Sequence, residues 1–111
     1  MKKDLSVLYL DTTNSKESRV IITVGNIKTE YNEETNQSTK SQNVLILVQK
    51  ALRDCGLQLH HITAIEVNNG PGSFTGTRVG VTVANALGWV LGKKVNGKQI
   101  TFPIYSKSKF D

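Results

Sequence analysis

The sequence contains a single cysteine, Cys55, which excludes an internal disulfide. Its two histidines, His60 and His61, are adjacent, so they cannot form a pair on one helical face, and no structural zinc site is expected. No apolar run approaches the roughly 18 residues needed to cross a membrane. The first apolar stretch is closed by Asp4 and Asp11, too soon for a secretory signal. These absences favour a cytoplasmic protein with no metal and no membrane partner.

The basic charge of the chain is concentrated near its C-terminus. Residues 1–92 carry nine Lys or Arg against eight Asp or Glu, whereas residues 93–111 carry five Lys against one Asp. The total of 111 residues suits one small domain. We therefore predict a domain over 1–92 followed by a basic segment over 93–111. We interpret this segment as a solvated tail and not as an RNA-binding one, because no aromatic or arginine cluster accompanies the lysines.

The apolar pattern predicts an α/β domain with a mixed sheet that begins as an antiparallel meander. Strands are expected at residues 5–10, 19–24, 27–31 and 62–67, and helices at 41–55 and over a stretch ending near 91. Residues 32–40 contain no apolar side chain and predict a loop. In the second helix the expected core-facing stripe comprises Val79, Val83, Ala86, Leu87 and Val90. Residues 99–105 predict an edge strand, because Pro103 cannot donate to a ladder.

A glycine-rich loop between the fourth strand and the second helix is the strongest local signal. Its candidate residues are Gly70, Pro71, Gly72, Ser73, Thr75 and Gly76. Such a loop can direct backbone amides at an anion near a helix N-terminus. It can equally be a tight turn capped by Ser73 or Thr75, and the residues alone slightly favour the turn. We also expect Gly72 or Gly76 to have a positive φ or to touch neighbouring backbone too closely for a Cβ.

A second polar candidate is Asp11-Thr12-Thr13, at the end of the first buried strand. A carboxylate there can hold a metal-bound water, and the hydroxyls can face a phosphate. The alternative is a turn in which the same side chains satisfy loose backbone groups. No nucleophile–base set is recognisable, so no catalytic residue is predicted.

Two helical features predict an interface. Five consecutive apolar residues, 44–48, exceed what one buried face needs, so Val44, Leu45, Ile46 and Val48 are candidates for partner contact. In the second helix, Gly80, Ala84 and Gly88 recur every fourth residue and would let another helix approach closely. The alternative is that these small residues only let the two helices of one chain pack together.

Two segments together resemble the N-terminal domain of the TsaB (YeaZ) family: Leu10-Asp11-Thr12-Thr13 and the run 69–80, N-G-P-G-S-F-T-G-T-R-V-G. The likeness covers about Leu5 to Gly92. It implies an actin-like ATPase half-domain (ASKHA, ribonuclease H-like). The sequence departs from the family at Asn69, where most members have Arg, and at Lys40, where many have His. Members usually continue into a second domain of similar size.

The resemblance implies a role in forming threonylcarbamoyladenosine in tRNA. TsaB is the catalytically silent relative of TsaD; it pairs with TsaD, self-associates, and the pair is bound by the ATPase TsaE. We therefore expect a non-catalytic partner subunit without a cofactor, which reaches tRNA only indirectly and forms a homodimer when alone. The alternatives are a stand-alone nucleotide- or phosphate-binding domain and a small RNA-binding module.

Overall fold

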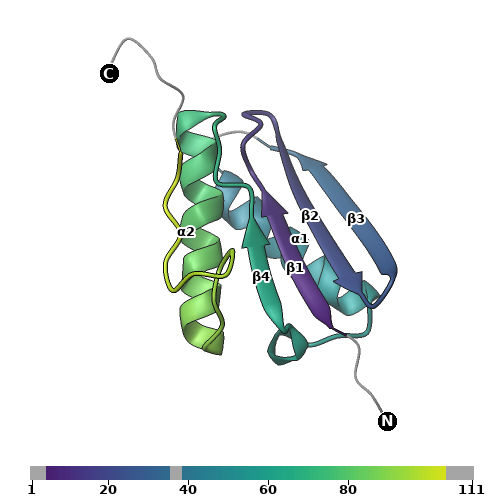
Figure 1. Cartoon of the computed structure of the whole chain (residues 1–111). Helices are drawn as coiled ribbons and strands as arrows, with labels where there is room; N and C mark the ends of the chain where they lie inside the picture. The colour runs from purple at the N-terminus through teal and green to yellow at the C-terminus, as the bar shows by residue number, and fades with distance from the viewer. Residues whose placement is uncertain (1–4, 36–38, 105–111) are drawn as a thin grey trace.

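The computed structural model describes residues 5–35 and 39–104, which form a four-stranded sheet with helices against it (Figure 1). The elements are β1 (Ser6–Asp11), β2 (Glu17–Val24), β3 (Ile27–Glu34), α1 (Lys40–Asp54), a 3-10 turn at Leu59–His61, β4 (Ala64–Val67) and α2 (Phe74–Leu91). The strand order is β3-β2-β1-β4. β1 pairs with β2 antiparallel and with β4 parallel, so the predicted mixed sheet with a meander start is confirmed.

One face of the sheet forms the core. Leu8 lies opposite Ile22 on β2 and opposite Ile65 on β4, and all three are buried. The next row repeats this arrangement with Leu10, Val20 and Val67. Because side chains alternate along a strand, the residues between these rows point to the other face. Figure 1 shows α1 crossing behind the sheet and α2 running beside β4.

β3 continues to Glu34, so the prediction of a loop over residues 32–34 is wrong. The three residues 32–34 lack apolar side chains, yet they complete the ladder with β2, where Arg19 lies opposite Asn32 and Glu17 opposite Glu34. Backbone pairing at the sheet edge does not require apolar side chains when those side chains face solvent. Residues 36–38 of the expected loop lie outside the described residues.

Helix α1 ends in a Schellman motif, close to the predicted stop. Gly56 has a φ of +69°, its amide donates to the Arg53 carbonyl, and the Leu57 amide donates to the Leu52 carbonyl. Leu57 folds back against the core, as predicted. The buried face of α1 includes Val44, Leu47, Val48, Ala51 and Leu52.

Helix α2 packs through its small residues on the loop after β1 and on the segment that follows the helix, so the predicted core-facing stripe is wrong in part. Gly80, Ala84 and Gly88 are buried, whereas Ala86 and Val90 are exposed and Val79 and Leu87 are half-buried. A row of small side chains lets neighbouring segments of the chain approach the helix axis closely. The larger apolar residues that dominate a hydropathy pattern are thereby rotated toward α1 and solvent.

The segment after α2 forms no regular strand within the described residues 92–104, which contradicts the predicted edge strand. Val95 makes isolated bridges to Ile65 and Lys98. The buried residues of the segment are Val95 and Thr101, while the alternating Ile100, Phe102 and Ile104 are exposed. The segment thus packs on β4 and α2 through side chains other than those that suggested a strand. The rest of the basic segment, 105–111, lies outside the described residues.

Candidate functional site

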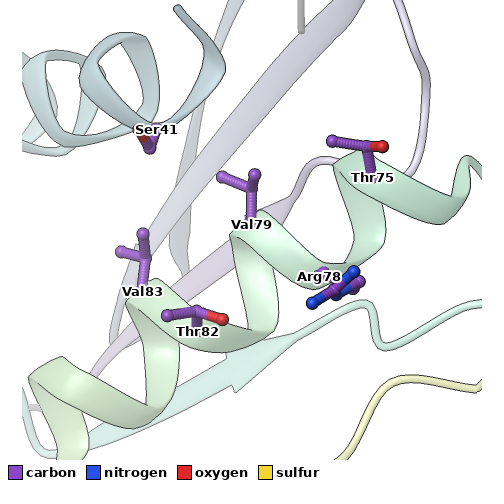
Figure 2. Close-up of a pocket in the computed structure, with 6 residues that line it drawn as sticks. All are labelled: Ser41, Thr75, Arg78, Val79, Thr82 and Val83. Carbon is purple, nitrogen blue, oxygen red and sulfur yellow. The ribbon is translucent and has the colours of Figure 1, made fainter. Parts of the chain in front are cut away.

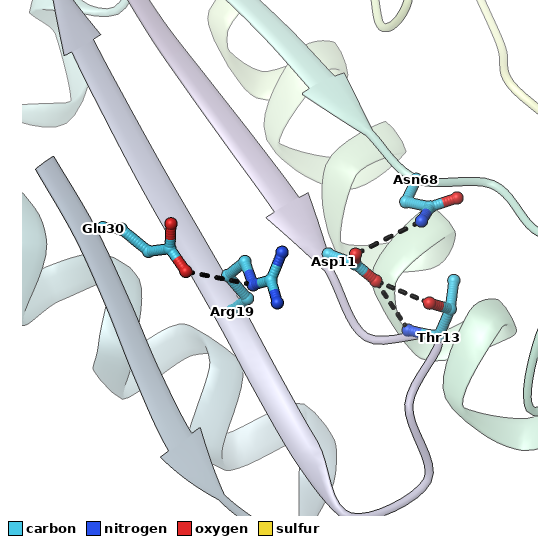
Figure 3. Close-up of polar contacts among 5 residues, drawn as sticks. All are labelled: Asp11, Thr13, Arg19, Glu30 and Asn68. Carbon is cyan, nitrogen blue, oxygen red and sulfur yellow. Dashed lines mark hydrogen bonds and ion pairs between the residues drawn. The ribbon is translucent and has the colours of Figure 1, made fainter. Parts of the chain in front are cut away.

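Asp11 is the centre of a hydrogen-bonded cluster at the end of β1 (Figure 3). Its Oδ1 accepts from the Thr13 amide at 3.0 Å and from the Thr13 hydroxyl at 2.7 Å. Its Oδ2 accepts from the Asn68 side chain at 3.2 Å. Burial alone raises the pKa of Asp11, but these bonds and the charge of Arg19 lower it below its usual range. The carboxylate is therefore held ionised by its own loop.

A polar hollow of about 220 Å³ opens beside this carboxylate and is lined by Asp11, Thr13, Asn14, Glu17 and Arg19. Arg19 forms an ion pair with Glu30 at 3.2 Å, across the strands on the open face of the sheet (Figure 3). Among the described residues no group of three His, Cys, Asp or Glu side chains is placed to hold a metal ion.

The loop after β1 packs directly on the glycine-rich loop and on α2. The buried Thr12 hydroxyl donates to the Gly76 carbonyl. A Cβ at Gly76 would collide with the Thr12 carbonyl, and one at Gly72 would lie 2.6 Å from the Thr13 Cβ. The expectation that one of these glycines is required by close contact is therefore confirmed for both, without a positive φ at either.

Three amides of the glycine-rich loop are engaged within the chain. The Gly70 amide donates to Asn68 Oδ1, and the Ser73 amide donates to the Thr13 carbonyl. Ser73 caps α2, because its hydroxyl accepts from the Gly76 amide at 3.1 Å. This geometry favours the capped-turn interpretation of Ser73 over a phosphate cradle. Thr75 lies exposed in the first turn of α2, and Gly70-Pro71 is a cis peptide.

Lys40 has a structural role that its place in the sequence does not predict. This residue is fully buried, and its Nζ donates to the Asn14 carbonyl at 3.0 Å and to the Glu17 carbonyl at 3.2 Å. Burial lowers the pKa of Lys40, opposed by the negative charges of Asp11 and Glu17. Lys40 thereby fastens the start of α1 to the β1–β2 turn. A lysine at a helix start usually lies in solvent, so only the tertiary structure could identify this contact.

The predicted interface residues separate into two groups. Leu45 and Ile46 are 44% and 57% exposed, whereas Val44 and Val48 belong to the buried core. Gly80, Ala84 and Gly88 are covered by the chain itself, which contradicts their proposed contact with another helix. A Cβ on Gly80 would strike the Thr12 hydroxyl, and one on Gly88 would lie 2.8 Å from the Lys93 carbonyl. The row of small residues therefore serves packing within the domain.

Two hollows follow the seam between α1 and α2. One, of about 280 Å³, lies where Val79 and Val83 point toward Ser41 (Figure 2). The other, of about 520 Å³, is mostly apolar and is lined by Leu45, Val48, Gln49, Leu52, Arg53, Leu57, Leu59 and Leu87. Exposed Leu45 thus lies at the rim of an apolar groove formed by both helices. None of the helices described in the structure is long and apolar enough to cross a membrane.

Comparison with known proteins finds similarity to both TsaD and TsaB. The family model for TsaD, tRNA N6-adenosine threonylcarbamoyltransferase, matches residues 32–97. The protein TsaB of tRNA threonylcarbamoyladenosine biosynthesis is 36% identical over 77% of this chain in Haemophilus influenzae and 31% identical over 78% in Bacillus subtilis. These alignments cover 35% and 38% of the two relatives, so the chain spans about a third of their length.

Solved structures agree with the sequence comparison. YeaZ from Pseudomonas aeruginosa superposes with a TM-score of 0.76 at 24% identity, covering 93% of this chain and 44% of that one. A second protein, described as similar to the peptidase YeaZ from Pseudomonas aeruginosa, superposes with the same TM-score at 25% identity, covering 91% of this chain and 43% of that one. The expected actin-like half-domain fold is thereby confirmed. By its sequence match to the TsaB proteins, with a fold that agrees, this chain belongs to the TsaB/YeaZ family.

Proposed function

We propose that the chain acts in the biosynthesis of threonylcarbamoyladenosine in tRNA, as a non-catalytic subunit that pairs with a TsaD-like protein. The relatives named for this pathway support the pathway itself. The pairing is supported by one observation, the apolar surface of α1 formed by Leu45 and Ile46 beside the α1–α2 groove. Because the small residues of α2 are already covered, the proposed contact uses this groove rather than Gly80, Ala84 and Gly88.

The apolar side chains at this surface favour a protein partner. Leu45 and Ile46 add exposed apolar area next to the larger hollow, whose leucines come from both helices and from the turn after α1. A helix of a partner could bury these side chains in the groove, as amphipathic helices do elsewhere. A partner with the same fold offers such helices. A homodimer in the absence of the partner, and recruitment of a TsaE-like ATPase to the pair, complete the proposal.

The test is co-purification with the TsaD-like protein of the same organism. Leu45→Glu combined with Ile46→Glu should abolish capture of the partner and reduce any dimer to a monomer in light scattering. The control is Ile27→Glu, which changes a more exposed apolar residue, 71% exposed, at the start of β3 and outside the α1–α2 groove. If the double variant binds the TsaD-like protein as well as the wild type does, the proposed contact is wrong.

The non-catalytic part of the proposal has its own test. The cluster around Asp11 directs its hydrogen bonds inward, and the amides of Gly70 and Ser73 are already engaged. We therefore expect no multiple-turnover ATP hydrolysis by the isolated chain, and no heat of ATP–magnesium binding in calorimetry. Hydrolysis that Asp11→Asn abolishes would support the stand-alone nucleotide-binding alternative instead.

A further inference from the structure

The side of α2 that faces away from α1 carries a surface of cations and exposed aromatic rings. No acidic residue occurs between Glu66 and Asp111, whereas Arg78, Lys93, Lys94 and Lys98 fall in this stretch. Trp89 is 86% exposed and Phe102 is 71% exposed. Elsewhere in the described residues acids and bases are interspersed along the strands and α1. We refer to Trp89, Lys93, Lys98 and Phe102 as the aromatic-basic face.

The segment that follows α2 carries Lys93, Lys98 and Phe102 and is bonded to α2 at Asn85. The Asn85 side chain donates to the Thr101 carbonyl at 2.7 Å and accepts from the Thr101 amide at 3.0 Å. Trp89 is one helical turn beyond Asn85, so it lies on the side of α2 that holds the segment. Because Thr101 points inward and is buried, its neighbour Phe102 points outward beside that helical side.

The segment is fixed in place, so this face is preformed. The Asn69 side chain donates to the Phe102 carbonyl at 3.1 Å, and the Ile104 amide donates to the Asn69 carbonyl. The Asn96 side chain exchanges two hydrogen bonds with the backbone of Val67, at 2.9 and 3.0 Å. Figure 1 shows the segment running back along α2 after the helix ends. Rings carried on such a fixed backbone lose little conformational entropy when a ligand stacks on them.

We propose that the aromatic-basic face binds single-stranded RNA directly. Cations attract a polyanion, and exposed rings provide stacking platforms for unpaired bases. A purely apolar protein partner would not require the charge bias. This surface lies on the opposite side of α2 from the α1–α2 groove, so the inference goes beyond the proposed pairing and does not rest on it.

The test uses the full chain and a labelled, unstructured RNA of about 12 nucleotides, a length within the range that single-strand sites cover. Trp89 is the single tryptophan of the sequence, so its emission reports stacking at this face. We expect RNA to quench this emission and to raise the anisotropy of the label. A duplex of the same length should bind more weakly, because its bases are already stacked.

Three variants locate the binding. Trp89→Ala should weaken RNA binding at least about fivefold, whereas Trp89→Phe should retain most of the affinity. Lys93→Gln combined with Lys98→Gln should reduce the salt slope, log K against log salt, by about 1.4. Lys28→Gln on β3 is the control and should change neither quantity. Circular dichroism melting should confirm that each variant remains folded.

Several outcomes would overturn the proposal. These are no binding at about 50 mM salt, unchanged tryptophan emission, or equal affinity of Trp89→Ala and wild type. If Trp89→Ala instead weakens capture of the TsaD-like protein and leaves RNA binding unchanged, the face is a protein interface. The variants Leu45→Glu and Ile46→Glu test the pairing on the other side of α2, so either proposal can fail without the other.

Discussion

The hydroxyl of Thr12 donates to the carbonyl of Gly76, and the carbonyl of Thr12 fills the space where a Cβ on Gly76 would lie. The end of β1 and the first turn of α2 are therefore joined by a hydrogen bond and by a contact that only glycine permits. Residues 64 positions apart are fixed to each other here. The two segments that identify the family in the sequence form one packed unit in the fold.

Replacement of Gly76 by Val should destabilise the domain by at least about 2 kcal/mol, because the added side chain must displace the Thr12 backbone. Chemical denaturation followed by circular dichroism measures the change in the free energy of unfolding. Thr75→Val is the matched control, since Thr75 is exposed one residue earlier in the helix. An unchanged unfolding midpoint for Gly76→Val would show that the loop adapts and that the glycine is not required.

Asp11 should make stability fall in acid. Its pKa is lowered in the folded state by the bonds from Thr13 and Asn68. The folded protein therefore favours the carboxylate, and the stabilisation is present above the unfolded pKa and lost as pH falls through the folded one. Asp11→Asn should cost on the order of 1 kcal/mol at pH 7 and flatten the decline between about pH 5 and pH 2. The measurement is urea unfolding of the wild type and of Asp11→Asn across this pH range. If the free energy of unfolding falls equally in acid for the two proteins, the prediction is wrong.

Lys40 should also make stability rise with pH, but in the alkaline range. Burial lowers its pKa from 10.5, so folding disfavours the protonated form, and stability rises as pH increases through the folded pKa toward the unfolded one. Lys40→Ala should cost about 2 kcal/mol at neutral pH, because the carbonyls of Asn14 and Glu17 lose a donor and a cavity remains. Lys40→Met, which fills the volume, should cost less. The free energy of unfolding of the wild type should rise relative to both variants at alkaline pH. If it does not rise, the Lys40 ammonium is in solvent and is not buried.

Substitution of Gly56 tests the cost of a left-handed backbone conformation without any steric clash. Its φ is +69°, and a Cβ there would meet no atom within 4 Å. Gly56→Ala should therefore cost about 1 kcal/mol through the left-handed conformation alone. Gly56→Asn should cost less, because asparagine tolerates this region better. Thermal melts of the two variants decide the matter, and equal stability of Gly56→Ala and wild type would mean that the last turn of α1 rearranges.

Local patterns were sufficient for most elements of the fold. The β-branched run around Val20 and Ile22, the Gly25-Asn26 turn and the stop at Gly56 each act over a few residues, and each is present in the structure. The wrong predictions concern segments whose structure depends on a partner segment distant in the sequence. Residues 32–34 are polar yet join the sheet because β2 offers a complete edge. The apolar alternation at Ile100, Phe102 and Ile104 produces no strand, because Thr101 and the Asn85 amide fix the segment instead.

By itself the sequence determined the class of fold, the family and the two loops that carry the resemblance, because strand periodicity, turn chemistry and a specific glycine spacing are local properties. Only the tertiary structure decided what those glycines contact. The spacing of Gly80, Ala84 and Gly88 shows that something approaches α2 closely, but the position of Thr12 and Lys93 decides that it is the chain itself. The same holds for Lys40, whose burial depends on carbonyls 23 and 26 residues away. Contacts between distant segments are set by how the elements pack, and no short stretch of sequence contains that information.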